Sequence, residues 1–198
     1  MYKTQMKFQR FVCYLAVISG VILFLYALGL MTDLYDSLYS AMRNPNNPHS
    51  TKVEGSWIYY DMQPFNKALL YLSIGVIILT AFLFLTQTHA RRKYYAGNLL
   101  CTGLFTAAAA GVCVYTHINA DNFKAQYLTT VDFEALLEYA AKKKYYYTDS
   151  TFWFDSHYAV CAILLAAAVL LLINYIWKKR LMREEDSLLC AGKKEAVL

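Results

Sequence analysis

The chain has 198 residues, a formal net charge of +5, 58% hydrophobic residues and only 17% charged residues. Soluble domains average roughly a quarter charged residues and a little under half apolar residues. The composition therefore excludes an ordinary soluble domain and favours a protein whose apolar surface faces lipid.

Four stretches of the chain lack Asp, Glu, Lys, Arg and His over 19 to 21 residues, at about 11–31, 68–86, 96–116 and 158–176. At 1.5 Å per residue, a helix of this length crosses a hydrocarbon core of about 30 Å. Backbone amides in lipid must find partners within their own segment, so each stretch predicts a transmembrane helix. The predicted fold class is all-α, with one four-helix transmembrane bundle over residues 1–198.

The charges of the connecting segments are unequal. Residues 1–10, 87–95 and 177–198 together carry +8, whereas the loops 32–67 and 117–157 carry −3. The positive-inside rule then predicts a cell-membrane protein with both termini and the tail 177–198 in the cytoplasm and both long loops exoplasmic. Because topology and anionic lipid account for the basic charge, we expect the lipid bilayer, and no nucleic acid, as a partner.

The first helix has an alternative interpretation as a signal peptide. It follows a basic stretch, and Ala27-Leu28-Gly29 resembles a cleavage site. Its apolar run is long for a signal peptide, however, so we expect the helix to be retained.

Small residues recur at four-residue spacing in two of the helices. The first helix has Ala16 and Gly20, and the third has Gly103, Ala107 and Gly111. Such residues allow the backbones of membrane helices to approach closely. We interpret both rows as packing inside the bundle, with a docking face for a partner subunit as the alternative.

Both exoplasmic loops show signs of folded structure. Apolar residues recur at helical spacing over 32–42, before a stop at residues 44–48. In the second loop, Thr129 or Thr130 is expected to cap a helix that runs to about Lys144. The residues expected on one face of that helix are Phe133, Leu136, Leu137 and Ala140, and the expected ion pair joins Glu138 to Lys142. We expect the two loops to form a compact exoplasmic cap.

Each of these loops ends in an aromatic stretch that contains an acid, and the similarity suggests a weak internal repeat. The candidate binding residues in these stretches are Trp57, Tyr59, Tyr60, Asp61, Trp153, Asp155 and His157. One interpretation is an interfacial belt, in which each Trp lies at headgroup level and each Asp caps the helix that follows. The other is an exoplasmic surface that binds a ligand or a protein partner.

Reactive residues give little sign of a catalytic or metal site. Neither loop contains cysteine, which excludes an exoplasmic disulfide, and we interpret the cysteines of the spans as small packing residues. His117 and His157 are expected at the same outer rim, near Asp121 and Asp155, but their spacing matches no metal motif. The phosphate-binding and nucleophile motifs of enzymes are also absent from the sequence. We therefore predict no metal, no cofactor and no enzymatic activity.

Three segments carry a resemblance to a family, namely Gly55–Asn66, Thr88–Tyr95 and Tyr146–Asp155. They resemble uncharacterised four-span membrane proteins of Gram-positive bacteria that accompany the permeases of carbohydrate ABC importers. The resemblance implies an accessory subunit that contacts transporter permease subunits, and it carries over no site residues.

The sequence as a whole predicts a non-enzymatic accessory or interaction subunit of a membrane transport complex. The first alternative is a small receptor or sensor whose exoplasmic cap binds a ligand. The second is a membrane enzyme with a site on the exoplasmic side.

Overall fold

The computed structural model describes residues 2–34, 38–39, 41, 52–88, 95–144 and 147–195. The helices are α1 (Tyr2–Leu34), α2 (Ile58–Thr88), α3 (Tyr95–Thr130), α4 (Phe133–Lys143) and α5 (Phe152–Glu195). The described part of the chain contains no strand, so the predicted all-α class is confirmed.

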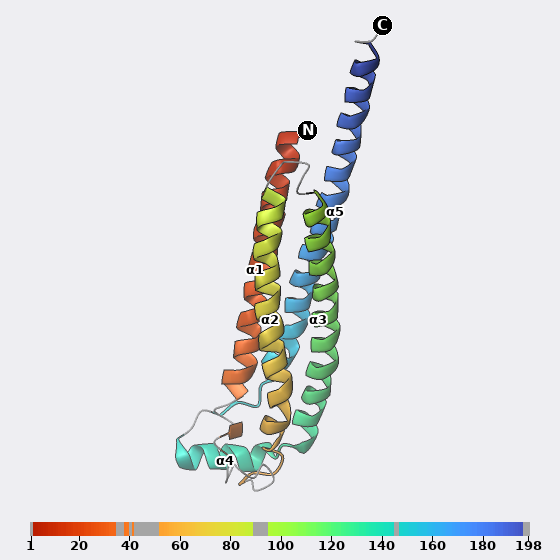
Figure 1. Cartoon of the computed structure of the whole chain (residues 1–198). Coiled ribbons are helices and arrows are strands. Elements are labelled where there is room, and N and C mark those ends of the chain that lie inside the picture. Colours follow the sequence, from red (N-terminus) through yellow and green to blue (C-terminus); the bar gives the residue numbers. More distant parts are fainter. Residues whose placement is uncertain are drawn as a thin grey trace.

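The four long helices lie side by side in a ring. Helix α1 packs against α2 and α5, and α3 packs against the same two helices from the other side (Figure 1). The start of α1 and the end of α5 lie at one end of the bundle, which we call the terminal end. Helix α4 lies across the opposite end, which we call the cap end. The first and the last described residues of the chain thus lie at the same end of the bundle. The assignment of that end to the cytoplasm stays a prediction.

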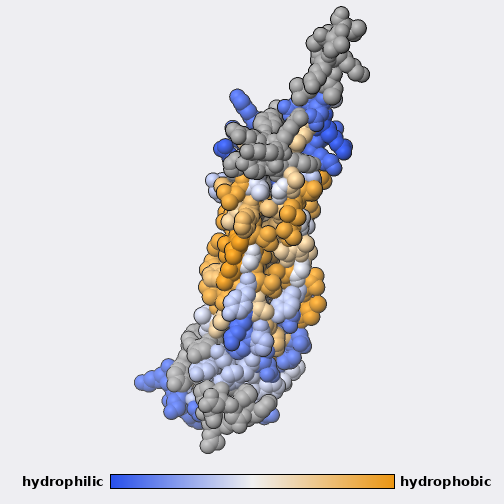
Figure 2. Space-filling view, in the orientation of Figure 1, coloured by the Kyte–Doolittle hydropathy of each residue, from blue (hydrophilic) through white to orange (hydrophobic). Residues whose placement is uncertain are grey.

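All four long helices contain segments long and apolar enough to cross a membrane: Lys3–Thr32, Ile58–Thr86, Ala96–Thr130 and Phe152–Leu188. On the face shown in Figure 2, an apolar band crosses the middle of the bundle and gives way to hydrophilic surface toward both ends. Large apolar side chains in this band are more than half exposed, for example Phe11, Ile78, Leu100 and Val169. Such a surface is stable in lipid and not in water. The chain is a multi-pass membrane protein.

The helices extend well beyond the apolar runs that predict them. Helix α2 begins at Ile58 instead of residue 68, and α3 continues past residue 116 to Thr130. Helix α5 runs to Glu195, through the segment expected to be a cytoplasmic tail. With 36 residues, α3 is about 54 Å long, whereas the hydrocarbon core is about 30 Å thick. Hydropathy marks only the part of each helix that lies in lipid, because the remaining turns carry polar residues.

The short helix α4 differs in part from its prediction. Its N-cap is Asp132, whose carboxylate accepts a 3.0 Å hydrogen bond from the Ala135 amide, so the predicted cap at Thr129 or Thr130 is wrong. Those two threonines are the last residues of α3. The predicted ion pair between Glu138 and Lys142 is confirmed at 3.3 Å.

The predicted apolar face of α4 is confirmed only in part. Leu136 and Ala140 are buried and Phe133 is half-buried, whereas Leu137 is 51% exposed. Leu137 therefore lies outside the face that packs on the bundle.

The segment before α2 holds the α3–α4 junction in place. Gly55 has a φ of +78°, and its α-carbon lies so close to the Thr130 carbonyl that a β-carbon would overlap it. The Asp132 amide donates a 3.2 Å hydrogen bond to the Glu54 carbonyl. Of the predicted helical extension over 32–42, only part lies within the described residues, where Leu38 and Ala41 are fully buried.

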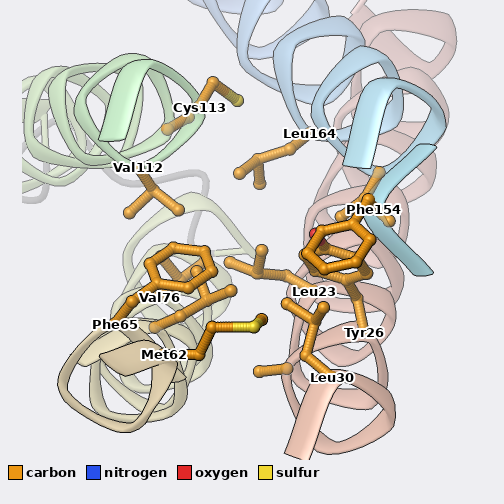
Figure 3. Packing of buried hydrophobic residues seen from close by; sticks show 14 of the residues in the cluster. Leu23, Tyr26, Leu30, Met62, Phe65, Val76, Val112, Cys113, Phe154 and Leu164 are labelled. Atoms are coloured by element: carbon orange, nitrogen blue, oxygen red, sulfur yellow. The ribbon is translucent and has the colours of Figure 1, made fainter. Parts of the chain in front are cut away.

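All four long helices contribute to the core. Figure 3 shows Leu23 of α1, Phe65 of α2, Val112 of α3 and Leu164 of α5 directed toward one another. The first small-residue row belongs to this core: Ala16 is fully buried, and a β-carbon at Gly20 would lie 3.3 Å from Ile77 of α2.

The second small-residue row does not pack inside the bundle, which corrects the interpretation from sequence. Gly103, Ala107 and Gly111 are all exposed, and a β-carbon built on either glycine would meet nothing within 4 Å. The row thus lies on the outer surface of α3.

Candidate metal centre

Three potential metal ligands from two helices meet near the cap end. Nδ1 of His117 lies 3.1 Å from Nε2 of His157. Each imidazole also approaches the carboxylate of Asp121, at 3.5 Å for His117 and 3.8 Å for His157. One ligand atom from each of the three residues lies within 4.8 Å of the other two. We call this group the His–Asp cluster.

The cluster follows from helix periodicity and the packing of α3 on α5. His117 and Asp121 are four residues apart in α3, so they lie one above the other on the same face of the helix. The antiparallel α5 places His157 beside them. The long apolar stretches of α3 and α5 end at Thr116 and begin at Tyr158, so the cluster lies where the apolar band meets the polar cap.

The three members of the cluster differ in burial. The side chain of His157 is 1% exposed, whereas those of His117 and Asp121 are 53% and 43% exposed. The cluster is thus buried on the side of His157 and open to solvent on the side of His117 and Asp121.

Neighbouring groups orient the buried imidazole and the carboxylate. Nδ1 of His157 is hydrogen-bonded to the Phe154 carbonyl oxygen. Since a carbonyl oxygen only accepts, Nδ1 carries the proton, and in the neutral ring the lone pair lies on Nε2, which faces the cluster. The Tyr158 hydroxyl donates to Asp121, at 3.2 Å from Oδ1 and 3.1 Å from Oδ2. Contacts of this kind orient metal ligands in proteins.

An ion pair joins α3 to α5 on the cap side of the cluster. We call the line of contact between these two helices the α3–α5 seam. Lys124 of α3 binds the carboxylate of Asp155 in α5, and the Thr151 hydroxyl donates to the same carboxylate at 2.7 Å. The Lys124 ammonium therefore makes its direct ion pair with Asp155 and not with Asp121.

Two thiols lie one helical turn deeper along the same seam. The sulfur of Cys113 is 3.7 Å from the Cys161 carbonyl oxygen, and the sulfur of Cys161 is 4.0 Å from the Cys113 carbonyl oxygen. Each cysteine is four residues from a histidine of the cluster, since Cys113 precedes His117 and Cys161 follows His157. Both cysteines remain free thiols.

The candidate residues of the first aromatic stretch lie around the start of α2. Trp57 is half-buried and lines a groove of about 470 Å³ beside the α3–α4 junction. Tyr59 is also half-buried, and its ring contacts those of Tyr39 and Tyr60. Asp61 lies exposed inside the first turn of α2 and not at its N-cap.

The second aromatic stretch has different surroundings. The ring of Trp153 lies against Gly29 of α1, and His157 belongs to the His–Asp cluster. Asp155 lies inside the first turn of α5, where its carboxylate binds the side chains of Lys124 and Thr151. The predicted role of Asp61 and Asp155 as N-caps is therefore wrong. The two stretches contact different parts of the bundle and do not repeat each other's surroundings.

His117 and Asp121 were not predicted to be metal ligands, because no sequence motif joins them to His157. A signal was nevertheless present in the spacing. Residues 113–121 read Cys-x3-His-x3-Asp, and residues 157–161 read His-x3-Cys, the reverse order. On two antiparallel helices, these patterns can place the two histidines beside each other and the two cysteines beside each other.

Comparisons of the chain with protein-family models, with curated proteins and with solved structures found no match. What this protein can do therefore follows from its own residues and geometry.

Proposed function

We propose that this protein is a non-enzymatic interaction subunit of a larger membrane assembly and that α3 carries the contact with its partner. The observation behind the proposal is the outward position of Gly103, Ala107 and Gly111. Without a hydrophobic driving force in lipid, membrane helices associate where small residues let their backbones approach. A row of this kind on the outer surface is suited to an incoming helix.

A groove beside the small-residue row also suits the docking of a helix. A groove of about 450 Å³ runs between α2 and α3, and Gly75 and Gly111 lie on its two sides. A β-carbon at Gly75 would also meet nothing within 4 Å. Tyr71 and Tyr115 line the same groove, which offers an apolar surface to a transmembrane helix of the partner.

The proposed partner is a permease subunit of a transport complex, with a carbohydrate ABC importer as the specific expectation. This choice rests on the resemblance of three segments to proteins that accompany such permeases. Purification of the protein from its native membrane in mild detergent tests the proposal, because a stoichiometric permease should accompany it.

Substitutions on α3 separate docking from folding. We expect Gly103→Leu and Ala107→Leu to reduce recovery of the partner and to leave the melting temperature in detergent unchanged, because both positions are exposed. Ala166→Leu on the exposed face of α5 is the matched control. Full recovery of the partner with the α3 variants would show that the row faces only lipid.

A second candidate function is a receptor or sensor whose cap binds a small ligand. The observation that favours it is the groove of about 470 Å³ lined by Trp57 and by Thr129–Asp132. If this groove binds a ligand, Trp57→Ala should remove a small molecule that is retained when the wild-type protein is purified. Purification without any bound small molecule would count against this candidate.

A further inference from the structure

We propose that His117, Asp121 and His157 form a binding site for one divalent transition-metal ion of the Zn²⁺ class. The site would lie at the cap end of the α3–α5 seam. This inference is independent of the docking function proposed for α3, because it rests on residues nearer the cap end of that helix than the row from Gly103 to Gly111.

The potential ligand atoms lie close enough together to share one ion. Ligand atoms 2.0–2.2 Å from a tetrahedral Zn²⁺ lie roughly 3.3–3.6 Å from one another. Nδ1 of His117 lies 3.1 Å from Nε2 of His157 and 3.5 Å from Oδ2 of Asp121, whereas Nε2 of His157 lies 3.8 Å from Oδ1 of Asp121. With one oxygen of Asp121 as the ligand, the three atoms lie within 4.8 Å of one another. An ion could therefore bind all three residues after a rotation of the Asp121 carboxylate, whose side chain is 43% exposed.

The buried imidazole of His157 is already oriented for a metal ion. Its proton lies on Nδ1, bonded to the Phe154 carbonyl, so Nε2 offers a lone pair in the direction of Asp121 and His117. A metal ion needs an imidazole nitrogen without a proton, and the second nitrogen of a metal-bound histidine usually donates to a carbonyl or a carboxylate. The side chain is 1% exposed, so its orientation is fixed before an ion arrives.

The charge of the cluster also favours a cation. With both imidazoles neutral, the carboxylate gives the cluster a net charge of −1, and Lys124, the nearest cation along α3, is paired with Asp155. This charge attracts a divalent ion, and the complex would carry a net charge of +1. The half-exposed side chains of His117 and Asp121 leave it a path from solvent and a position for a water ligand.

The donor set indicates the class of metal. Imidazole nitrogens suit Zn²⁺, Cu²⁺, Ni²⁺ and Co²⁺, whereas Mg²⁺ and Ca²⁺ prefer oxygen ligands alone. Three protein ligands with an open fourth position also match zinc sites that exchange a water molecule. We therefore expect binding of Zn²⁺ and Co²⁺, and not of Mg²⁺.

The alternative to a metal site is a hydrogen-bonded network. In that case Nδ1–H of His117 donates to Nε2 of His157, and Asp121 accepts hydrogen bonds from its neighbours. The two accounts differ in their response to added metal, which the following experiment measures.

The experiment titrates Zn²⁺ by calorimetry into the full chain, purified in detergent without a histidine tag and treated with a chelator. Metal analysis after removal of free ion gives the stoichiometry, and the visible absorption of Co²⁺ reports tetrahedral nitrogen and oxygen ligands. We expect one ion per chain. His117→Ala and Asp121→Asn should each weaken binding at least tenfold, because even residues that only orient metal ligands have effects of about 10- to 100-fold.

Asp61→Asn is the matched control for Asp121→Asn, since Asp61 is an exposed acid of α2 and the same change there should leave the affinity unchanged. Both cluster variants change side chains that are about half exposed, so we expect their helices to remain folded, and circular dichroism tests this. A stoichiometry of zero for the wild type would overturn the proposal in favour of the hydrogen-bonded network. Wild-type affinity in both His117→Ala and Asp121→Asn would overturn it as well.

Discussion

The indole ring of Trp153 in α5 lies against Gly29 in α1, in space that any side chain at position 29 would need. Gly29 is buried and Trp153 is half-buried. The glycine thus lets the first residues of α5 approach α1 closely. Part of the second aromatic stretch is therefore occupied by packing within the bundle.

This contact predicts that Gly29→Ala destabilises the protein. The new β-carbon overlaps the indole ring, so the helices must separate or Trp153 must move, at a cost of about 1–3 kcal/mol. The measurement is thermal unfolding in detergent. Gly75→Ala is the control, since a β-carbon there meets nothing within 4 Å. Equal melting temperatures for the two variants would contradict the contact.

The side of the membrane on which each end lies can be tested with cysteine labelling. Ser150 lies exposed at the cap end and Ser187 lies exposed near the end of α5. The charge difference of +8 against −3 predicts that an impermeant thiol reagent modifies Ser150→Cys in intact cells and spares Ser187→Cys. The wild-type chain gives the background from its own cysteines. The reverse labelling pattern would invert the assignment of the two ends.

The two acids of the aromatic stretches should respond differently to the same substitution. Asp61 is exposed in the first turn of α2, so Asp61→Asn should leave the melting temperature nearly unchanged. Asp155→Asn weakens the contacts with Lys124 and Thr151 and should lower it. Lys124→Met should lower the melting temperature by a similar amount to Asp155→Asn. The double variant should melt no lower than either single variant. Additive effects would show that the ion pair does not act as a unit.

The aromatic residues allow a test of the binding-surface interpretation. Trp57 lines the cap groove, so Trp57→Phe should preserve folding and weaken any ligand or partner contact there. Trp153→Phe should instead affect stability, because its ring packs on Gly29. Binding and melting temperature measured on both variants separate these effects. Unchanged binding in both would contradict the binding-surface interpretation.

The register of α3 against α5 can be tested through their thiols. Cys113 and Cys161 face each other across the seam, so mild oxidation with diamide should link them. A protease site inserted after Asp149, which is exposed between the two cysteines in sequence, would reveal the link. The cleaved halves should remain joined on a non-reducing gel, and Cys161→Ser should release them. Free halves after oxidation of the wild type would contradict the register.

The membrane helices could be predicted from sequence because their apolar runs have the length that a bilayer demands. Their ends could not, since the outer turns of α3 and the last turns of α5 are polar and resemble loop or tail sequence. The predicted N-cap of α4 is wrong by two to three residues, because α3 continues through Thr129 and Thr130. Asp132, which lies immediately before α4, was a better N-cap by side-chain chemistry.

The His–Asp cluster could be predicted only in outline. Four-residue spacing places His117 and Asp121 on one face of a helix, but His157 lies 40 residues away along the chain from His117. Its approach depends on the axial register of two antiparallel helices, which is set by packing along their whole length. The outward position of Gly103 and Gly111 depends in the same way on how α3 is rotated within the bundle.

Helix α5 runs without interruption from the cap end of the bundle to the terminal end and beyond it. It has 44 residues, or about 66 Å, and contains neither glycine nor proline from Phe152 to Cys190. Sharp kinks in helices usually occur at such residues, so we expect α5 to change its tilt as one rigid helix. A change in the tilt of α5 at His157 would then displace its last turns, which project beyond the start of α1 on the opposite side of the bilayer (Figure 1).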